Sequence, residues 1–307
     1  MTDAPILIAG PTASGKSALA LAIAERVNGV VINADSMQVY RELAILTARP
    51  SQVDEARVPH ALYGHVAAMD AYSAGRFIID AKVAIDAAIA HGHRPIIVGG
   101  TGLYFKALLE GLSPIPIIPD DIRSHWRAEA ERIGAPALHD LLGQRDPVMA
   151  ARLKTNDTQR IVRALEVLEA SGRSLADWQA QPGTPVIDPA TATKLAVLPD
   201  RAALYARAEA RFDRMLAMGA LAEAEALGRL QLDPDLPALR ALGVAQLIGV
   251  VQGKLDLTEA ISVAKAETRQ YIKRQATWIN TNMIAWKSVT EQQIERLNDD
   301  FMPFIQS

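Results

Sequence analysis

The chain has 307 residues, of which 50% are hydrophobic, and carries a formal net charge of −3. This length can bury one large core or two smaller ones, as expected of a globular protein. The absence of cysteine excludes disulfides, thiolate zinc sites, iron–sulfur clusters and cysteine nucleophiles, and is typical of a reducing compartment. No apolar run reaches the roughly 18 residues of a membrane span, and no basic leader stands at the N-terminus. We therefore expect a cytoplasmic protein without membrane contact.

The first motif is a phosphate loop between an expected strand at 5–9 and an expected helix over 17–27. The segment GPTASGKS fits the pattern G-x-x-x-x-G-K-[ST], whose backbone N–H groups surround a di- or triphosphate. Lys16 would add a point charge and Ser17 a ligand for Mg²⁺. By itself the pattern, known as an ATP-binding motif, suggests only a nucleoside triphosphate. The expected phosphate-binding residues are Gly10, Pro11, Thr12, Ala13, Ser14, Gly15, Lys16 and Ser17.

Strands and helices alternate after the loop. Buried strands are expected at 30–33 and 95–98, with an amphipathic helix over 73–90. Continuous apolar strands that alternate with helices predict a parallel sheet covered on both faces. From 119 to 182 no strand-like run occurs, and three helices are expected over 120–133, 135–142 and 157–170.

The chain then returns to the pattern of its first part. A strand is expected at 194–198, with Asp200 placed to cap the helix that follows, and a long helix is expected over 257–280. The predicted fold class is therefore α/β, a P-loop-type parallel sheet flanked by helices with an inserted all-helical domain. The expected boundaries are 1–118 for the first part of the core, 119–190 for the helical insertion and 191–307 for the rest of the core.

One acid is missing and another is present near the loop. Proteins that hydrolyse ATP or GTP usually end a hydrophobic strand with an aspartate that helps to hold Mg²⁺, but the strand at 95–98 runs into GGTGLY. The first acid after a core strand is Asp35, at an edge where ligands bind in open α/β sheets. It could hold magnesium, cap a helix through Ser36, or act as a base.

Several segments resemble, in order, the signature blocks of the tRNA dimethylallyltransferases, also called tRNA isopentenyltransferases. They are GPTASGKS, NADSMQVYREL, PHALYGHV, YSAGRF, VGGTGLYFKALLEGL, NDTQRIVRALEVLEASGRSL and KRQATWI. The resemblance covers nearly the whole chain, and VGGTGLY together with ADSMQ is far more specific than the phosphate loop.

The resemblance implies that the loop holds the diphosphate of dimethylallyl diphosphate and not ATP. The family transfers the dimethylallyl group to N6 of the adenosine 3′ of the anticodon, position 37 of tRNA, with Mg²⁺ as cofactor. A diphosphate leaving group needs the loop and Mg²⁺ but no device to position a hydrolytic water, which agrees with the missing aspartate.

This chemistry assigns expected roles to a few side chains. Asp35 would accept the N6 proton as a base. Lys16, the loop amides, Ser17 with Mg²⁺ and the Thr101 hydroxyl would stabilise the departing diphosphate. Gln38 could donate to and accept from the edge of an adenine that has left its stack. The expected catalytic residues are thus Asp35, Thr101 and Lys16.

The resemblance also indicates where tRNA binds, through its anticodon stem-loop. Without it, Gln159, Arg160 and Arg163 could equally form a solvated helix face. The implied tRNA-binding residues are Asp35, Ser36, Met37, Gln38, Thr101, Arg123, Gln159, Arg160, Ile161, Val162 and Arg163.

Two other basic groups leave alternatives open. Lys265, Arg269 and Lys273 share one face of the last expected helix and could follow an RNA backbone, although charge runs are usually solvated faces. Arg207 and Arg211 could each reach the diphosphate, and the sequence does not choose between them.

The chain departs from the family pattern at Leu46, where a glycine is common, and at Val244, where a tyrosine is common. Leu46 suggests a reshaped loop after Asp35. The competing functions are an adenylate isopentenyltransferase, which should lack most of the insertion, a nucleotide kinase, and a non-catalytic RNA-binding module. A monomer is the default expectation for the oligomeric state.

Overall fold

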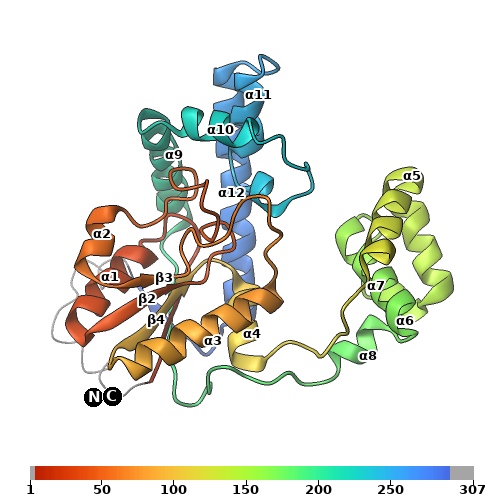
Figure 1. Ribbon diagram of the computed structural model, residues 1–307, viewed down its shortest axis with the longest axis horizontal. Helices are drawn as coiled ribbons and strands as arrows, with labels where there is room; N and C mark the ends of the chain where they lie inside the picture. The colour runs from red at the N-terminus through yellow and green to blue at the C-terminus, as the bar shows by residue number, and fades with distance from the viewer. Residues whose placement is uncertain (1–3, 291–307) are drawn as a thin grey trace. The chain divides into compact units, whose positions relative to one another are not determined.

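A computed structural model describes residues 4–290 (Figure 1). The chain divides into two compact units, one made of the described residues up to Leu109 and from Val186 onward, the other of Glu110–Pro185. This second unit begins and ends earlier than the expected 119 and 190. The carbonyl of Leu108 accepts hydrogen bonds from the N–H groups of Val186, at 2.9 Å, and Ile187, at 3.0 Å. The segment that leaves the first unit and the segment that returns to it are therefore bonded to each other.

The first unit is built on one parallel sheet. Its strand order is β3-β2-β4-β1-β5-β6, and every pairing is parallel. The four expected strands are present, and β3 and β6 were not expected because two- and three-residue strands leave no periodic pattern. The strands are β1 Ile6–Ala9, β2 Gly29–Asn33, β3 His60–Ala61, β4 Arg94–Gly99, β5 Thr193–Val197 and β6 Lys287–Val289.

Apolar clusters cover both faces of the sheet, as the continuous apolar strands predicted. Alternate residues of a strand point to opposite faces, so Ile6 and Ile8 of β1 pack in one cluster with Leu19 of α1. Leu7 of β1 packs on the other face in a larger cluster that includes Phe77 of α3. The helices of this unit are α1 Lys16–Val27, α2 Gln52–Arg57, α3 Ala74–Ala90, α4 Gly102–Glu110, α9 Arg201–Ala217, α10 Ala220–Gly228, the 3₁₀ helix η1 Pro237–Arg240, α11 Val244–Val251 and α12 Leu257–Asn282.

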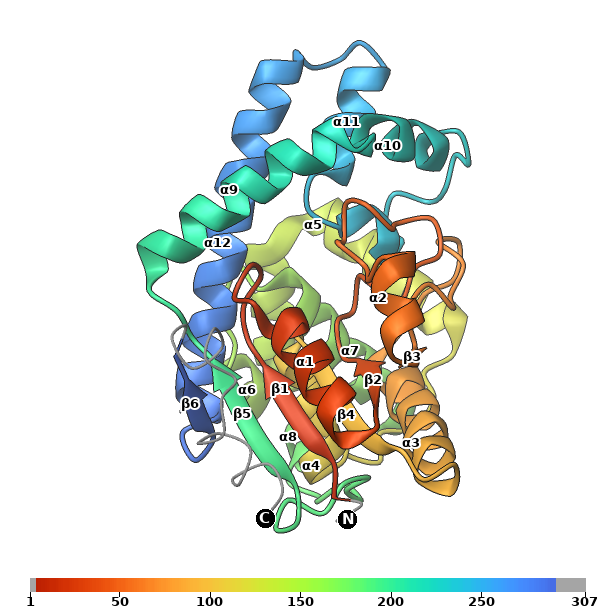
Figure 2. The same ribbon diagram turned by 90° about the vertical axis from the view of Figure 1, so that its left-hand side faces the viewer.

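Helices α9 and α12 pack against each other (Figure 2), and two ion pairs join them. Lys265 of α12 lies 2.6 Å from a carboxylate oxygen of Asp213 of α9, and Arg269 pairs with Glu209 one turn further along. Both cations are thus engaged in ion pairs between two helices, and the expectation that they follow an RNA backbone stays a prediction.

The second unit is all-helical and has its own apolar core around Trp126, Leu138 and Leu165. The two helices expected over 120–133 and 135–142 are one element, α5, broken at Gly134, whose φ of 78° and ψ of 166° are not helical. Glycine alone adopts such a φ without strain. The helices are α5 Asp120–Arg145, α6 Pro147–Ala150, α7 Thr158–Ser171 and α8 Leu175–Gln179. Within residues 4–290 no helix is both long enough and apolar enough to cross a membrane.

Candidate active site

The phosphate loop joins β1 to the start of α1. Gly15 has a φ of 90° and precedes the first helical residue, Lys16, so a glycine is needed for the chain to turn into the helix. Ala13 also has a positive φ, 64°. The Lys16 ammonium donates to the carbonyl of Pro11 at 3.2 Å, which folds the lysine back over the loop.

Three charged groups meet at this loop. Burial lowers the pKa of Lys16 from 10.5 to about 8, and the positive charge of Arg211 lowers it further, whereas the carboxylate of Asp35 opposes the shift. Burial also lowers the pKa of Arg211, and Asp35 again opposes this. Of the two arginines that the sequence left as alternatives, Arg211 is the one whose charge acts on Lys16. An anion placed here would find two partly desolvated cations.

The segment after β2 fixes Asp35. Asn33 is fully buried; its side-chain oxygen accepts the Asp35 N–H at 2.8 Å, and its nitrogen donates to the carbonyls of Asp35 and Leu62, each at 3.0 Å. One carboxylate oxygen of Asp35 accepts the N–H of Met37 at 3.0 Å. No helix begins at residues 35–38, so the helix-cap interpretation of Asp35 is wrong. Asp35 instead closes a turn at the end of β2, with its second oxygen available for chemistry.

Thr101 lies directly beside this turn. Its hydroxyl accepts the N–H of Ser36 at 3.0 Å and donates to the Ser36 hydroxyl at 3.3 Å. The backbone N–H of Thr101 donates to the carbonyl of Ala34 at 3.3 Å. The ends of β2 and β4 are therefore joined through both backbone and side chain, and Thr101 is held next to Asp35.

Gly99 makes the approach of these two strand ends possible. A Cβ atom added there would lie 2.0 Å from the carbonyl oxygen of Ala34. Gly100, the next residue, would clash in the same way with the side-chain nitrogen of Gln275, at 2.2 Å. Of the first two glycines in the VGGTG block, Gly99 is required by contact with the backbone, and Gly100 leaves room for the Gln275 side chain.

Gln275 of α12 joins the phosphate loop to the segment after β4. Its side-chain oxygen accepts the N–H of Thr12 at 2.9 Å, and its nitrogen donates to the carbonyl of Gly100 at 3.0 Å. The side chain is buried. The sequence analysis gave this glutamine no role, although it belongs to the KRQATWI block. One consequence is that the Thr12 amide, expected to contact phosphate, is already engaged by the protein.

Three tyrosines are close enough to Asp35 for its charge to act on them. Burial raises the pKa of Tyr63, Tyr104 and Tyr271, and in each case the negative charge of Asp35 raises it further. The three hydroxyls therefore stay protonated near neutral pH and can donate hydrogen bonds. The sequence analysis did not single them out, because they come from three distant segments.

Gln38 is oriented by a neighbouring loop. Its side-chain nitrogen donates to the carbonyls of Thr47 and Ala48, both at 2.9 Å. The expectation that Gln38 both donates to and accepts from an adenine is therefore wrong for this arrangement, because both amide hydrogens are engaged. Its amide oxygen remains as the group that can meet a ligand.

The expected tRNA-binding residues of the helical unit divide into two kinds. Ile161 is fully buried and Val162 nearly so, within the core of that unit. Their side chains cannot contact RNA, and this expectation is corrected. Arg160 is 75% exposed beside Asp157 at 3.2 Å, and Arg163 pairs with Glu166 at 3.4 Å.

Two further residues of this set lie at the surface of the same unit. Arg123 is 3.8 Å from the exposed carboxylate of Asp120, and Gln159 is exposed. Neither contact buries the side chain, so both residues can reach a solvent-side ligand.

A magnesium ion would have few protein ligands. Within the described part of the chain, no cluster of three or more His, Cys, Asp or Glu side chains could hold a metal. The exposed Ser17 and the Asp35 carboxylate are the oxygen donors close to the loop. Mg²⁺ is commonly held by one or two side chains together with substrate phosphates, so these donors fit a metal that arrives with a diphosphate.

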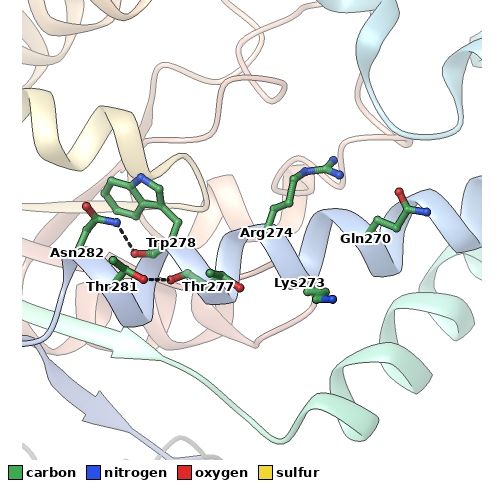
Figure 3. A pocket seen from close by; sticks show the side chains of 7 residues that line it. All are labelled: Gln270, Lys273, Arg274, Thr277, Trp278, Thr281 and Asn282. Atoms are coloured by element: carbon green, nitrogen blue, oxygen red, sulfur yellow. Dashed lines mark hydrogen bonds between the residues drawn. The ribbon is translucent and has the colours of Figure 1, made fainter. Parts of the chain in front are cut away.

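A pocket of about 600 Å³ lies along the exposed side of α12 (Figure 3). Trp278 closes one part of it and packs on Gly102, where an added Cβ would be 2.2 Å from the indole ring. Lys273 and Arg274 give the pocket two cations, and an aromatic ring beside cations suits a nucleotide. The pocket is lined by Gln270, Lys273, Arg274, Thr277, Trp278, Thr281 and Asn282.

Comparison with known families gives two matches. The family described as IPP transferase matches residues 38–282, and the family described as isopentenyl transferase matches residues 5–60. A tRNA dimethylallyltransferase of Parvibaculum lavamentivorans is 53% identical over 300 residues, with 98% of this chain and 95% of that protein covered. One of Mesorhizobium japonicum is 58% identical over 273 residues, with 89% and 85% covered.

Solved structures of similar proteins share the fold. A tRNA isopentenylpyrophosphate transferase of Bacillus halodurans superimposes with a TM-score of 0.70 at 29% identity, covering 99% of this chain and 97% of that one. A eukaryotic dimethylallyltransferase acting on tRNA gives a TM-score of 0.80 at 26% identity, covering 98% and 78%. The chain therefore belongs to the IPP transferase family and is an enzyme that transfers a prenyl group.

Proposed function

We propose that this enzyme transfers the dimethylallyl group of dimethylallyl diphosphate to N6 of adenosine 37 of tRNA and releases diphosphate. The observation that carries the proposal is that Asp35, after β2, and Arg211 of α9 both act electrostatically on Lys16 of the phosphate loop. Two cations suit a diphosphate, and a carboxylate beside them suits an acceptor for the amine proton. The relatives named above support tRNA as the acceptor.

The bond changes follow from these positions. The adenine N6 attacks C1 of the dimethylallyl group, the C1–O bond breaks, and the electron pair leaves with the diphosphate. Asp35 takes the N6 proton through the oxygen that does not accept from Met37. Lys16 and Arg211 offset the charge that develops on the leaving group.

The remaining loop groups support this arrangement. The N–H groups of Gly10, Thr12 and Ser14 donate to Gly99, Gln275 and Pro11, so the amides left to face the diphosphate are those of Ala13 and of residues 15–17. Thr101 holds the Asp35 turn through Ser36. Ser17 and Asp35 are the residues that would hold a Mg²⁺ ion, which would neutralise part of the diphosphate charge.

In the helical unit we propose that Arg123, Gln159, Arg160 and Arg163 contact the tRNA backbone near the anticodon. Their side chains are at least partly exposed, and exposed arginines bind phosphate with little loss of hydration. We further propose that the protein acts as a monomer in the cytoplasm. An adenylate isopentenyltransferase remains the alternative, and an all-helical unit of 110–185 argues against it because free AMP needs no such surface.

The first prediction tests the acceptor. Purified protein with Mg²⁺ and labelled dimethylallyl diphosphate is expected to label an anticodon stem-loop RNA and leave AMP unlabelled. A stem-loop with guanosine at the acceptor position serves as the matched control and should take no label. Label in AMP would establish the alternative acceptor, and label in neither would contradict prenyl transfer to adenine.

The second prediction concerns Asp35. Substitution Asp35→Asn keeps the side-chain oxygen that accepts from Met37 but removes the base. We expect the single-turnover rate to fall by about 10²- to 10⁴-fold, while inorganic pyrophosphate still binds with similar affinity. The exposed Asp70→Asn serves as a control and should behave as the wild type. A rate in Asp35→Asn within a factor of about two of the wild type would rule out Asp35 as the base.

The third prediction concerns pH. The pKa of Lys16 is about 8 in the free enzyme, so the ammonium loses its proton as the pH rises through that value. A bound diphosphate favours the protonated form, and the affinity for pyrophosphate should therefore fall above pH 8, by up to about tenfold per pH unit. Isothermal titration calorimetry with pyrophosphate measures this affinity in the wild type and in Lys16→Arg, which is the comparison because arginine does not titrate in this range. An identical pH dependence in both proteins would show that Lys16 is not the titrating group.

The fourth prediction concerns RNA binding. Arg160→Ala should weaken stem-loop binding and reduce the slope of log Kd against log salt by about 1, as expected for one lost phosphate contact. Arg229→Ala is a matched control, because Arg229 is 74% exposed and also pairs with an acid on its own helix. If the two variants show the same salt slope, Arg160 makes no phosphate contact.

A further inference from the structure

A single carboxylate holds the loop that follows the Asp35 turn. Glu223 of α10 accepts the backbone N–H groups of three consecutive residues, Ala44, Ile45 and Leu46, each at 2.8 Å. Both of its oxygens are used, Oε2 for the first two and Oε1 for the third. Consecutive N–H groups that point inward form a concave site for an anion, and here the anion is supplied by the protein itself.

The same loop is also fixed from within. The N–H of Ala48 donates to the carbonyl of Ile45 at 2.9 Å, and the hydroxyl of Thr47 donates to the carbonyl of Leu43 at 2.5 Å. Leu46 is buried in the larger core, and Ala48 has a φ of 52°. With its N–H groups bound to Glu223, the loop turns the carbonyls of Thr47 and Ala48 toward Gln38.

These two carbonyls determine which end of the Gln38 amide faces them. Both are acceptors, so the NH₂ group must lie against them, and the amide cannot be rotated by 180° without placing oxygen against oxygen. The other end of the amide, its oxygen, is then the polar group that Gln38 can offer to a ligand. Gln38 stands three residues after Asp35, in the turn that carries the proposed base.

We propose that Glu223 is a positioning residue for the acceptor base: it holds the 44–48 loop, and the loop makes Gln38 present only an oxygen to the nucleobase. This inference rests on the proposed function, because it assumes that Gln38 meets the acceptor base. An oxygen at that place accepts a hydrogen from the amino group of adenine. The same edge of guanine carries a carbonyl oxygen, which an acceptor repels. Glu223 thus acts on base selection through the 44–48 loop and Gln38.

The test compares the binding of two stem-loop RNAs, with adenosine or guanosine at the acceptor position, in the absence of dimethylallyl diphosphate. We expect the wild type to favour the adenosine RNA. In Glu223→Gln, one carboxylate oxygen is replaced by an NH₂ donor that opposes the loop N–H groups, and the preference should fall about tenfold. The affinity for inorganic pyrophosphate should not change, which separates base positioning from a general loss of structure.

Matched variants give the control. Glu225 lies on the same helix as Glu223, but its carboxylate pairs with Arg229 and does not hold the loop. The Glu225→Gln variant should therefore keep the wild-type preference. Gln38→Leu should lose the preference for the adenosine RNA. Adding Glu223→Gln to Gln38→Leu should cause no further loss, because both substitutions act through the Gln38 amide. The Gln38→Leu result also tests the proposal if Glu223→Gln fails to fold.

The outcomes are distinguishable from a failure of the proposed function. A wild type that labels the adenosine stem-loop, together with an unchanged preference in Glu223→Gln or in Gln38→Leu, would overturn the positioning role alone. A wild type that binds both RNAs equally and labels neither would overturn the proposed function, and this inference with it. Equal loss of RNA preference and pyrophosphate affinity in Glu223→Gln would assign Glu223 a purely structural role.

Discussion

The close approach of the β4 and β2 ends is the constraint on which the rest of the site depends. Because β4 lies between β1 and β2 in a parallel sheet, the three segments that leave these strands emerge side by side. Gly99 lets the end of β4 pass within van der Waals distance of Ala34, and Thr101 then reaches Ser36. Without that approach, the phosphate loop and the Asp35 turn would share an edge of the sheet but not a common site.

Gln275 adds a second constraint from the far end of the sequence. Its buried amide bridges Thr12 and Gly100, which are 88 residues apart by number, and it does so from α12. A buried amide that satisfies one donor and one acceptor fixes both more strongly than an apolar contact would, because any displacement leaves polar groups unpaired. The site is therefore complete only when the last long helix has packed on the sheet, and its geometry is a product of non-local contacts.

The sequence predicted the features that repeat or that carry a distinctive residue pattern. The four long strands, the helices at their ends and the phosphate loop were recognisable because apolar periodicity and the glycine–lysine pattern are local signals. Asp35 was singled out because it is the first acid after a core strand, and Thr101 because the VGGTG block resembles the family, and the structure brings them together. The all-helical insertion was expected, but its limits were not, because the joint at Leu108 is made by backbone groups.

Other parts of the site could not be predicted, for equally physical reasons. Glu223 binds backbone N–H groups, so no side chain in the 44–46 segment indicates its partner. Gln275 looks like any polar residue of an amphipathic helix until the fold places it against Gly100. Ile161 was expected at the RNA because the family resemblance implied a contact over residues 159–163, yet its side chain lies in the core. Residue patterns reveal what a side chain can do, whereas its direction depends on the packing of distant segments.

The pairing of Glu223 with its loop has one more consequence, for anion selectivity. A row of three inward N–H groups is the kind of concavity that captures phosphate, and this one lies on the loop that orients Gln38. Because a protein carboxylate already fills it, both volume and charge exclude a phosphate group from it. The proposed diphosphate substrate would therefore not compete for the N–H groups of residues 44–46, because Glu223 occupies them permanently.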